Sequence, residues 1–203
     1  SLSKPVTAAA VMLLVERGEI TLGTPVSSVL PEFSGGGREA VQLLHLLTHT
    51  SGLPDMVTEN VALRAAHAPL SEFFKAVCRT ELLFAPGERV SYQSMGFVVM
   101  STLVERLTGM PFAEFVRQEL FLPAGMKESH FGLPPEDDGA GDAQVELPAD
   151  QQDVDYHWNS RYWRQLGAPW GGLTTTTAGL LRFLSLFVER RVLSPATVEA
   201  MTR

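Results

Sequence analysis

"SLSKPVTAAAVMLLVERGEI", residues 1–20, is the stretch that decides the fold. Its apolar residues cover nearly the whole circumference of a predicted helix over residues 3–17, which is typical of a helix buried on all sides. Gly18 supplies the usual C-terminal stop of such a helix. The segment therefore predicts a helical protein whose first helix is buried.

The rest of the chain predicts further helices and little strand. Residues 19–33 read as turns with one possible strand, and residues 129–169 as a long polar, irregular segment with "PPEDDGAGD" (134–142) at its loosest point. The helices expected are 41–49, 71–83 with Ser71 as N-cap, 94–109 stopped by Gly109, 111–121 with Pro111 at its first position, 178–191, and 194–201 with Ser194 as N-cap.

Length and composition limit the class of protein. The chain has 203 residues, 45% hydrophobic and 19% charged, enough to bury the core of a single domain over residues 1–203. A formal net charge of −7 without a basic stripe argues against a nucleic-acid partner. A lone cysteine, Cys78, excludes an intramolecular disulfide, and no apolar run is long enough to span a membrane. Because the chain starts inside a helical pattern without Met, we expect an interior piece of a longer polypeptide.

Ser1 and Lys4 are the first candidates for chemistry. Residues three apart share a helix face, with Cβ atoms roughly 5–6 Å apart, so the lysine amine can reach the serine hydroxyl. The positive end of the helix dipole would favour an alkoxide at Ser1. This spacing also occurs by chance, and the alternative is the ordinary start of a buried helix.

Two further stretches carry polar groups. His45 and His49 have the i, i+4 spacing of zinc ligands, but the general base expected directly after the first histidine is Leu46, so we predict no metal site. The histidines then satisfy backbone groups where a helix enters a tight loop. Tyr92 precedes a buried helix; its hydroxyl either anchors a corner or passes a proton, with Lys4 as a cationic neighbour.

Together, these pieces resemble one family. The stretches "SLSKPVTAAAVMLLVERGEITLGTPVSSVLPEF", "LLHLLTHTSGLP", "FAPGERVSYQSMGF", "LTGMPFAEFVRQELFLPAGM" and "GAPWGGLTTTTAGLLRFL" are similar in order and spacing to the serine β-lactamase-like hydrolases, which include class C β-lactamases, DD-peptidases and related esterases. The resemblance implies that Ser1 is the acylated nucleophile, Lys4 its base partner and Tyr92 the proton shuttle. It implies a small-molecule ester or amide substrate, no cofactor and no metal.

The sequence departs from the family pattern in two places. Ser94 stands where the family's Tyr-x-Asn motif has asparagine, so the amide that would hold a substrate carbonyl is missing, which favours an esterase-type site. The family's third motif, Lys-Thr-Gly or His-x-Gly on a strand, would lie downstream of the chain. We therefore expect a mostly α structure: the helical lobe of the α+β β-lactamase/transpeptidase-like fold, with the antiparallel sheet largely missing. A complementing polypeptide would supply the rest, or the fragment cannot turn over.

The aromatic segment before Gly171 is the candidate substrate surface. We expect Ser94, Trp170 and Gly171 to contact substrate and the aromatics at 156–170 to cover the site, although they can equally be loop anchors packed on helices. Two other functions stay open. One is an N-terminal-nucleophile hydrolase, in which the α-amine of Ser1 is the base, although such enzymes are rich in sheet. The other is a catalytically incomplete helical domain that binds a partner or a peptidoglycan-like ligand.

Overall fold

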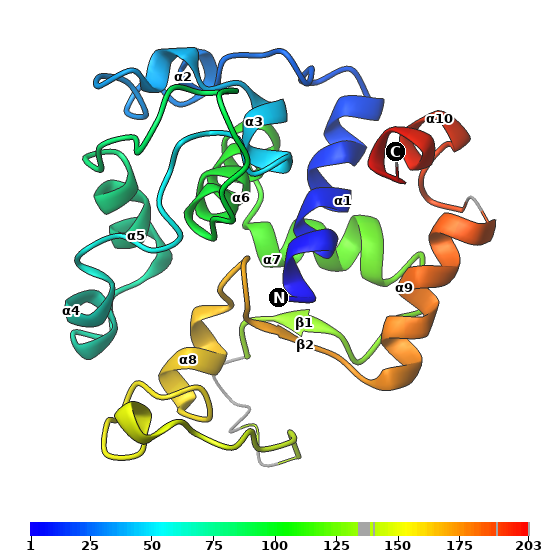
Figure 1. Ribbon diagram of the computed structural model, residues 1–203. Helices are drawn as coiled ribbons and strands as arrows, with labels where there is room; N and C mark the ends of the chain where they lie inside the picture. The colour runs from blue at the N-terminus through cyan, green and yellow to red at the C-terminus, as the bar shows by residue number, and fades with distance from the viewer. Residues whose placement is uncertain (134–138, 140, 190, 203) are drawn as a thin grey trace.

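The computed structural model describes residues 1–133, 139, 141–189 and 191–202. Its helices are α1 (Ser3–Glu16), α2 (Val26–Val29), α3 (Leu43–Leu47), α4 (Asn60–Ala65), α5 (Leu70–Val77), α6 (Met95–Thr108), α7 (Phe112–Val116), α8 (Arg161–Leu166), α9 (Thr177–Glu189) and α10 (Pro195–Thr202), with short 3-10 turns at Arg38–Ala40 and Ala149–Gln151 and a π-helical turn at Arg117–Phe121 (Figure 1). Strands β1 (His130–Phe131) and β2 (Leu173–Thr174) pair antiparallel, His130 opposite Thr174. The mostly helical class is thus confirmed.

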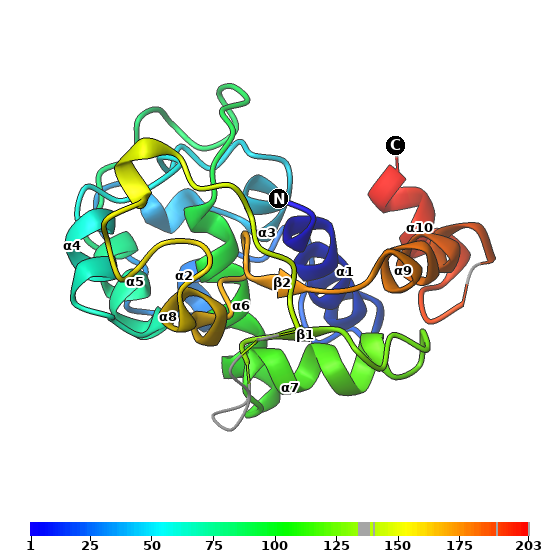
Figure 2. The ribbon, with the colours of Figure 1, turned by 90° about the horizontal axis from the view of Figure 1, so that it is seen from below.

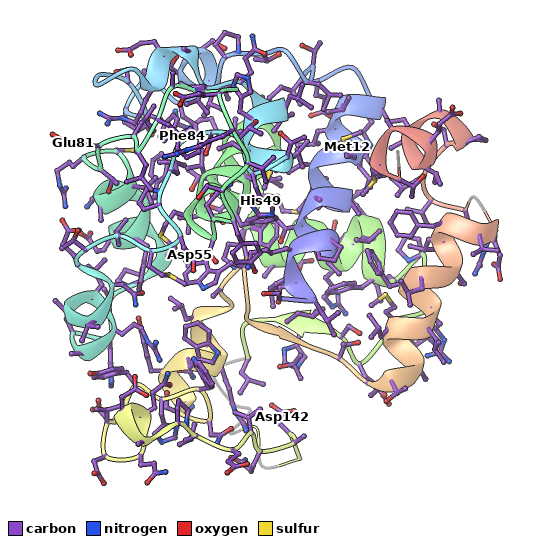
Figure 3. All side chains as sticks on the ribbon, viewed as in Figure 1. Met12, His49, Asp55, Glu81, Phe84 and Asp142 are labelled. Carbon is purple, nitrogen blue, oxygen red and sulfur yellow. The ribbon has the colours of Figure 1, made fainter. Side chains whose placement is uncertain are left out.

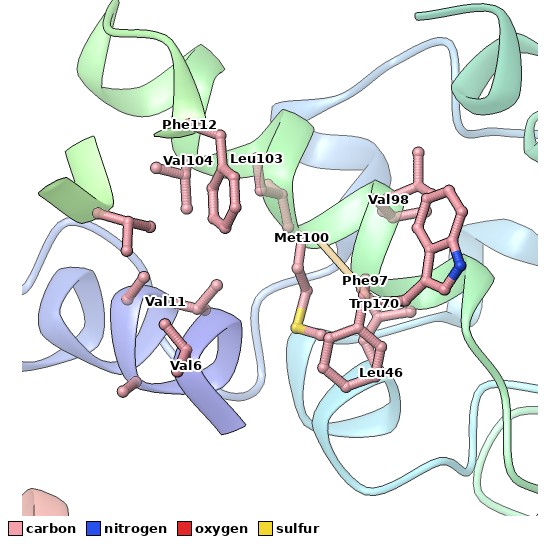
Figure 4. Packing of buried hydrophobic residues seen from close by; sticks show 14 of the residues in the cluster. Val6, Val11, Leu46, Phe97, Val98, Met100, Leu103, Val104, Phe112 and Trp170 are labelled. Carbon is pink, nitrogen blue, oxygen red and sulfur yellow. The ribbon is translucent and has the colours of Figure 1, made fainter. Parts of the chain in front are cut away.

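The core forms around α1 and α6, which pack against each other at the centre of the molecule. Val6 and all the residues from Ala9 to Leu14 are at most 4% exposed, which confirms that α1 is largely buried; Pro5 is exposed and Ala8 and Val15 are half-buried, so one stripe of the helix is not fully covered. Figure 4 shows Val6 and Val11 on one side of this interface and Met100 and Val104 on the other. Burying an apolar side chain of this size stabilises the fold by about 1.5–3 kcal/mol, so this interface sets the position of the N-terminus of α1.

The other helices surround this pair. α4 and α5 lie on one side, while α9 and α10 lie together on the opposite side of α1 (Figures 1 and 2). Helix α6 ends at Gly109, whose left-handed φ of 68° confirms the predicted stop. The predicted cap of α10 is also confirmed, because the Ser194 hydroxyl accepts the Thr197 N–H at 3.2 Å.

Several local expectations were wrong. Residues 26–29 form a helical turn rather than part of a strand, and the helix expected over 71–83 starts at Leu70 and ends at Val77, so Ser71 is not its cap. The segment 129–169, expected to be irregular, contains β1, the turn at 149–151 and α8, while residues 134–138 and 140 of its loosest part lie outside the described residues. Pro111 precedes α7 as its N-cap instead of occupying the first helical position.

No helix in the described part of the chain is both long enough and apolar enough to cross a bilayer.

Candidate functional site

The first turn of α1 brings Ser1 and Lys4 together. The Lys4 N–H donates to the Ser1 carbonyl at 3.1 Å, and the Lys4 ammonium donates to the Ser1 hydroxyl at 3.4 Å. Ser1 is exposed, whereas Lys4 is 6% exposed. The pair predicted from its spacing therefore exists, with the hydroxyl at the surface and the amine beneath it.

Lys4 is buried without a carboxylate partner among the described residues. Its Nζ donates to the Trp170 carbonyl at 3.0 Å and lies 4.8 Å from the ring centroid of Tyr92 and 5.5 Å from that of Phe97. A carbonyl dipole and two ring faces therefore stabilise the ammonium in place of a counter-ion. The positive charge of Lys4 remains available to act on Ser1 and Tyr92.

Tyr92 completes a three-residue cluster around the Ser1 hydroxyl. The hydroxyls of Tyr92 and Ser1 share a hydrogen bond of 2.7 Å, and the phenol side chain is 51% exposed. Partial burial acts to raise the pKa of Tyr92, but hydrogen bonds with Lys4 and Ser1 and the charge of Lys4 outweigh it, so the pKa of this phenol lies below its ordinary value. The Ser1 hydroxyl thus has two proton-exchanging groups within hydrogen-bond distance.

His49 positions Tyr92 by stacking on its ring and by hydrogen bonds to the two residues that flank it. Its carbonyl accepts the Ser91 N–H at 2.8 Å, its Nδ1 accepts the Gln93 N–H at 3.2 Å, and its ring stacks on Tyr92 at 4.9 Å. Burial, and then the positive charge of Lys4, lowers the pKa of His49, which keeps Nδ1 free to accept. Helix α3 ends at Leu47 and His49 has a φ of 59°, so His45 and His49 do not occupy one helix face as zinc ligands would.

Segment 168–174 is fastened to α1 by three hydrogen bonds. Thr7 donates to the Pro169 carbonyl at 2.8 Å, Lys4 donates to the Trp170 carbonyl, and Ser3 accepts the Leu173 N–H at 3.0 Å. Sequence reasoning missed Ser3 and Thr7, because their partners lie more than 160 residues away along the chain. The sequence did carry a signal for both residues, because Ser3 and Thr7 are polar side chains within an otherwise apolar, largely buried helix.

Trp170 and Gly171 lie at the wall of the cavity that contains Ser1. The Trp170 side chain is 4% exposed and packs against Phe73 and Trp163, at ring-centroid distances of 5.8 Å and 6.1 Å. Most of the indole therefore belongs to the core. The Gly171 N–H is used within the turn, where it donates to the Ala168 carbonyl at 3.0 Å.

Ser94 lies at the cavity wall, 3% exposed, and its hydroxyl donates to Asp55 Oδ1 at 2.7 Å. Asp55 also lines the cavity and was not singled out from the sequence. Asp55 lies within the loop of residues 48–59 that joins α3 to α4, as does His49, and Figure 3 labels both residues. The position of Asp55 directly after the "HTSGLP" turn was its sequence signal, but no pattern indicated contact with Ser94.

These groups line a cavity of about 1620 Å³ together with β1, β2 and parts of the aromatic segment. Trp158 and Trp163 line this cavity. Tyr162 instead donates to the Ala68 carbonyl at 2.9 Å and stacks on His67 at 4.6 Å. Both alternatives for the aromatic segment therefore hold, each for different residues.

When the Tyr92 hydroxyl is ionised, which its lowered pKa favours, it can take the proton of the Ser1 hydroxyl as that oxygen attacks an electrophile. The fold and this cluster define a helical region built around a Ser-x-x-Lys pair and a tyrosine.

Comparisons with known proteins identify the family of the chain. The family model described as Beta-lactamase matches residues 1–203. The chain is 37% identical over 133 residues to penicillin-binding protein 4* of Bacillus subtilis, covering 64% of this chain and 29% of that protein. It is 36% identical over 146 residues to esterase EstB of Burkholderia gladioli, covering 64% and 37%. The crystal structure of a penicillin-binding protein from Bacillus halodurans superposes with a TM-score of 0.76 at 26% identity, covering 98% of this chain and 61% of that one.

The chain belongs to the β-lactamase family, as the sequence resemblance indicated. It spans roughly a third of the length of these two curated relatives. Its structure corresponds to the helical lobe of the β-lactamase/transpeptidase-like fold, which confirms the expected fold class.

Proposed function

We propose that this chain carries the nucleophile and the proton-transfer groups of a serine hydrolase that acts on an ester or amide through an acyl-enzyme. One observation carries the proposal: Tyr92 Oη at 2.7 Å and Lys4 Nζ at 3.4 Å both contact Ser1 Oγ. Relatives named as an esterase and as a penicillin-binding protein support the hydrolase class.

In the reacting form Tyr92 is a phenolate: as Ser1 Oγ attacks the carbonyl carbon, its proton passes to the phenolate oxygen, which becomes a phenol. The lowered pKa of Tyr92 suits that acceptor role, because the nearby ammonium of Lys4 stabilises a phenolate. Tyr92 then protonates the leaving group, which departs from the tetrahedral intermediate. Water releases the acyl group from Ser1 by the reverse path.

Lys4 acts in this scheme as a fixed positive charge under the nucleophile. Its hydrogen bond to the Trp170 carbonyl holds Nζ in place, so the charge needs no reorganisation as negative charge moves from the Tyr92 phenolate to Ser1 Oγ. Esters are the favoured substrates over amides, since Ser94 presents no amide to orient a substrate carbonyl.

Fluorophosphonate labelling followed by intact mass measurement tests the proposal. The protein, purified in its full gene-encoded length, should gain one phosphonyl group, and Ser1→Ala should gain none. Lys4→Met and Tyr92→Phe should slow labelling by about 10²–10⁴-fold, while Ser28→Ala, which changes an exposed hydroxyl elsewhere, is the control. Labelling that persists in Ser1→Ala overturns the proposal.

The same reagent distinguishes the two alternative functions. Burial, and then the charge of Lys4, lowers the pKa of the α-amine of Ser1, so an N-terminal base is tested by acetylating that amine in the 203-residue chain. Labelling that survives Lys4→Met but is blocked by acetylation favours the N-terminal-nucleophile mechanism. A folded protein that is never labelled favours the non-catalytic, ligand-binding domain.

A further inference from the structure

Asp55 and Ser94 form a rigid pair in the wall of the cavity. The Ser94 hydroxyl donates to Asp55 Oδ1 at 2.7 Å, and the Ser94 N–H donates to the Asp55 carbonyl at 3.2 Å. The two residues are therefore joined through side chain and backbone at once. Because Ser94 precedes the first residue of α6, the pair is anchored to one of the two central helices.

The Asp55 carboxylate is not neutralised by the protein. It forms no ion pair within the described ranges, its Oδ2 has no hydrogen bond there, and the residue is exposed to the cavity. Its charge is close enough to act on the phenol of Tyr92 and on the imidazole of His49. A solvated carboxylate has thus been placed beside the proposed reaction centre.

Hydrogen-bond polarity decides what this wall can bind. Ser94 uses its single hydroxyl proton on Asp55, so its oxygen offers lone pairs only, and the ionised carboxylate also only accepts. A wall of acceptors with one negative charge suits a cationic N–H donor. It leaves a substrate carbonyl or carboxylate without a donor at this position.

The distance to the nucleophile sets where that donor lies in the substrate. Ser94 is two residues from Tyr92, so their Cα atoms are at most ~7 Å apart, and Tyr92 touches Ser1. Asp55 and Ser1 also line the same cavity, and the charge of Asp55 acts on the phenol that contacts Ser1, so one small substrate can reach both residues.

We propose that Asp55, held by Ser94, binds the ammonium group of an aminoacyl substrate, so that the preferred substrates are esters or amides of amino acids with a free amine near the scissile carbonyl. The inference rests on the proposed hydrolase function and assigns the substrate class of the same site. Asp55 is its specificity residue and Ser94 the residue that positions Asp55.

The test uses two esters that differ in one group. Alanine methyl ester carries an ammonium on the carbon next to the ester carbonyl, and lactic acid methyl ester carries a hydroxyl on that carbon instead. Each ester is used in its D and its L form. Hydrolysis by the full gene-encoded protein is followed in a pH-stat. We expect kcat/KM for one alanine enantiomer to exceed that for the matching lactate by about 10- to 100-fold, the range for a hydrogen bond to a charged group.

Variants assign that preference to the carboxylate. Asp55→Asn should reduce the alanine-to-lactate ratio to near one, and Ser94→Ala should reduce it in part by freeing Asp55. Asp153→Asn, which removes an exposed carboxylate outside the cavity lining, should leave the ratio unchanged. In the wild type, the ratio should also fall as pH rises through the pKa of the substrate ammonium.

Each outcome has one meaning. Equal rates for the two esters, or a preference that persists in Asp55→Asn, overturn the ammonium site and leave the hydrolase standing. Failure of a folded protein to hydrolyse either ester or to be labelled by fluorophosphonate overturns the proposed function, and this inference with it.

Discussion

Replacing Gly52 by alanine should unfold the loop that carries His49 and Asp55. Gly52 has a φ of +81°, and a Cβ added there would lie 2.2 Å from the carbonyl oxygen of Phe84. Ordinary contacts begin at 3.4 Å, so the backbone at residue 84 would have to move by about 1 Å. That movement breaks the hydrogen bond of 2.7 Å that the Leu83 N–H donates to the Gly52 carbonyl.

The size of the effect follows from these contacts. A non-glycine residue in the left-handed region costs about 1 kcal/mol. The lost backbone hydrogen bond costs about 1 kcal/mol and forced repacking about 1–3 kcal/mol. We therefore expect Gly52→Ala to lower the free energy of unfolding by about 3–5 kcal/mol.

Gly18→Ala is the matched control. Gly18 has a similar φ of +73°, but an added Cβ would meet nothing within 4 Å, so only the backbone penalty of about 1 kcal/mol applies. Urea unfolding followed by circular dichroism gives both free energies. A Gly52→Ala protein no less stable than Gly18→Ala would refute the assignment of Gly52 to a close backbone approach.

Three further results are expected. Burial raises the pKa of the Cys78 thiol to about 11, against 9.0 for a free cysteine. At pH 8 a disulfide reagent should therefore modify the folded protein about 100-fold more slowly than the urea-unfolded protein; equal rates would contradict this. Ser3→Ala removes the acceptor of the Leu173 N–H and should cost about 1–2 kcal/mol in urea unfolding, against less than about 0.5 kcal/mol for the exposed Ser28→Ala. Because the pKa of His49 is lowered in the folded state, the unfolded chain binds more protons below about pH 6.5, so stability should fall as pH falls through that value, and less so in His49→Asn; identical slopes would contradict the burial of that imidazole.

Much of the helical fold could be predicted because it depends on local patterns. An apolar circumference marks α1 as buried, Gly109 stops α6, and Ser194 caps α10, and each effect acts within a few residues. Predictions failed where distant contacts decide the backbone. After α5 ends at Val77, for example, Arg38 donates to the Thr80 carbonyl at 2.7 Å, a partner 42 residues away.

The candidate site divides in the same way. The Ser1–Lys4 pair lies within one helical turn, so spacing predicted that the two side chains can meet, and the family resemblance singled out this pair and Tyr92 as candidate catalytic groups. The sequence by itself thus determined the helical class, the family and the three groups of the cluster. The tertiary structure decided that Tyr92 reaches Ser1 from 91 residues away, that Lys4 is held by the Trp170 carbonyl, and that Ser94 turns its hydroxyl to Asp55. The reason is that side-chain periodicity is written along the chain, whereas the partner of a buried polar group is chosen by which elements pack together.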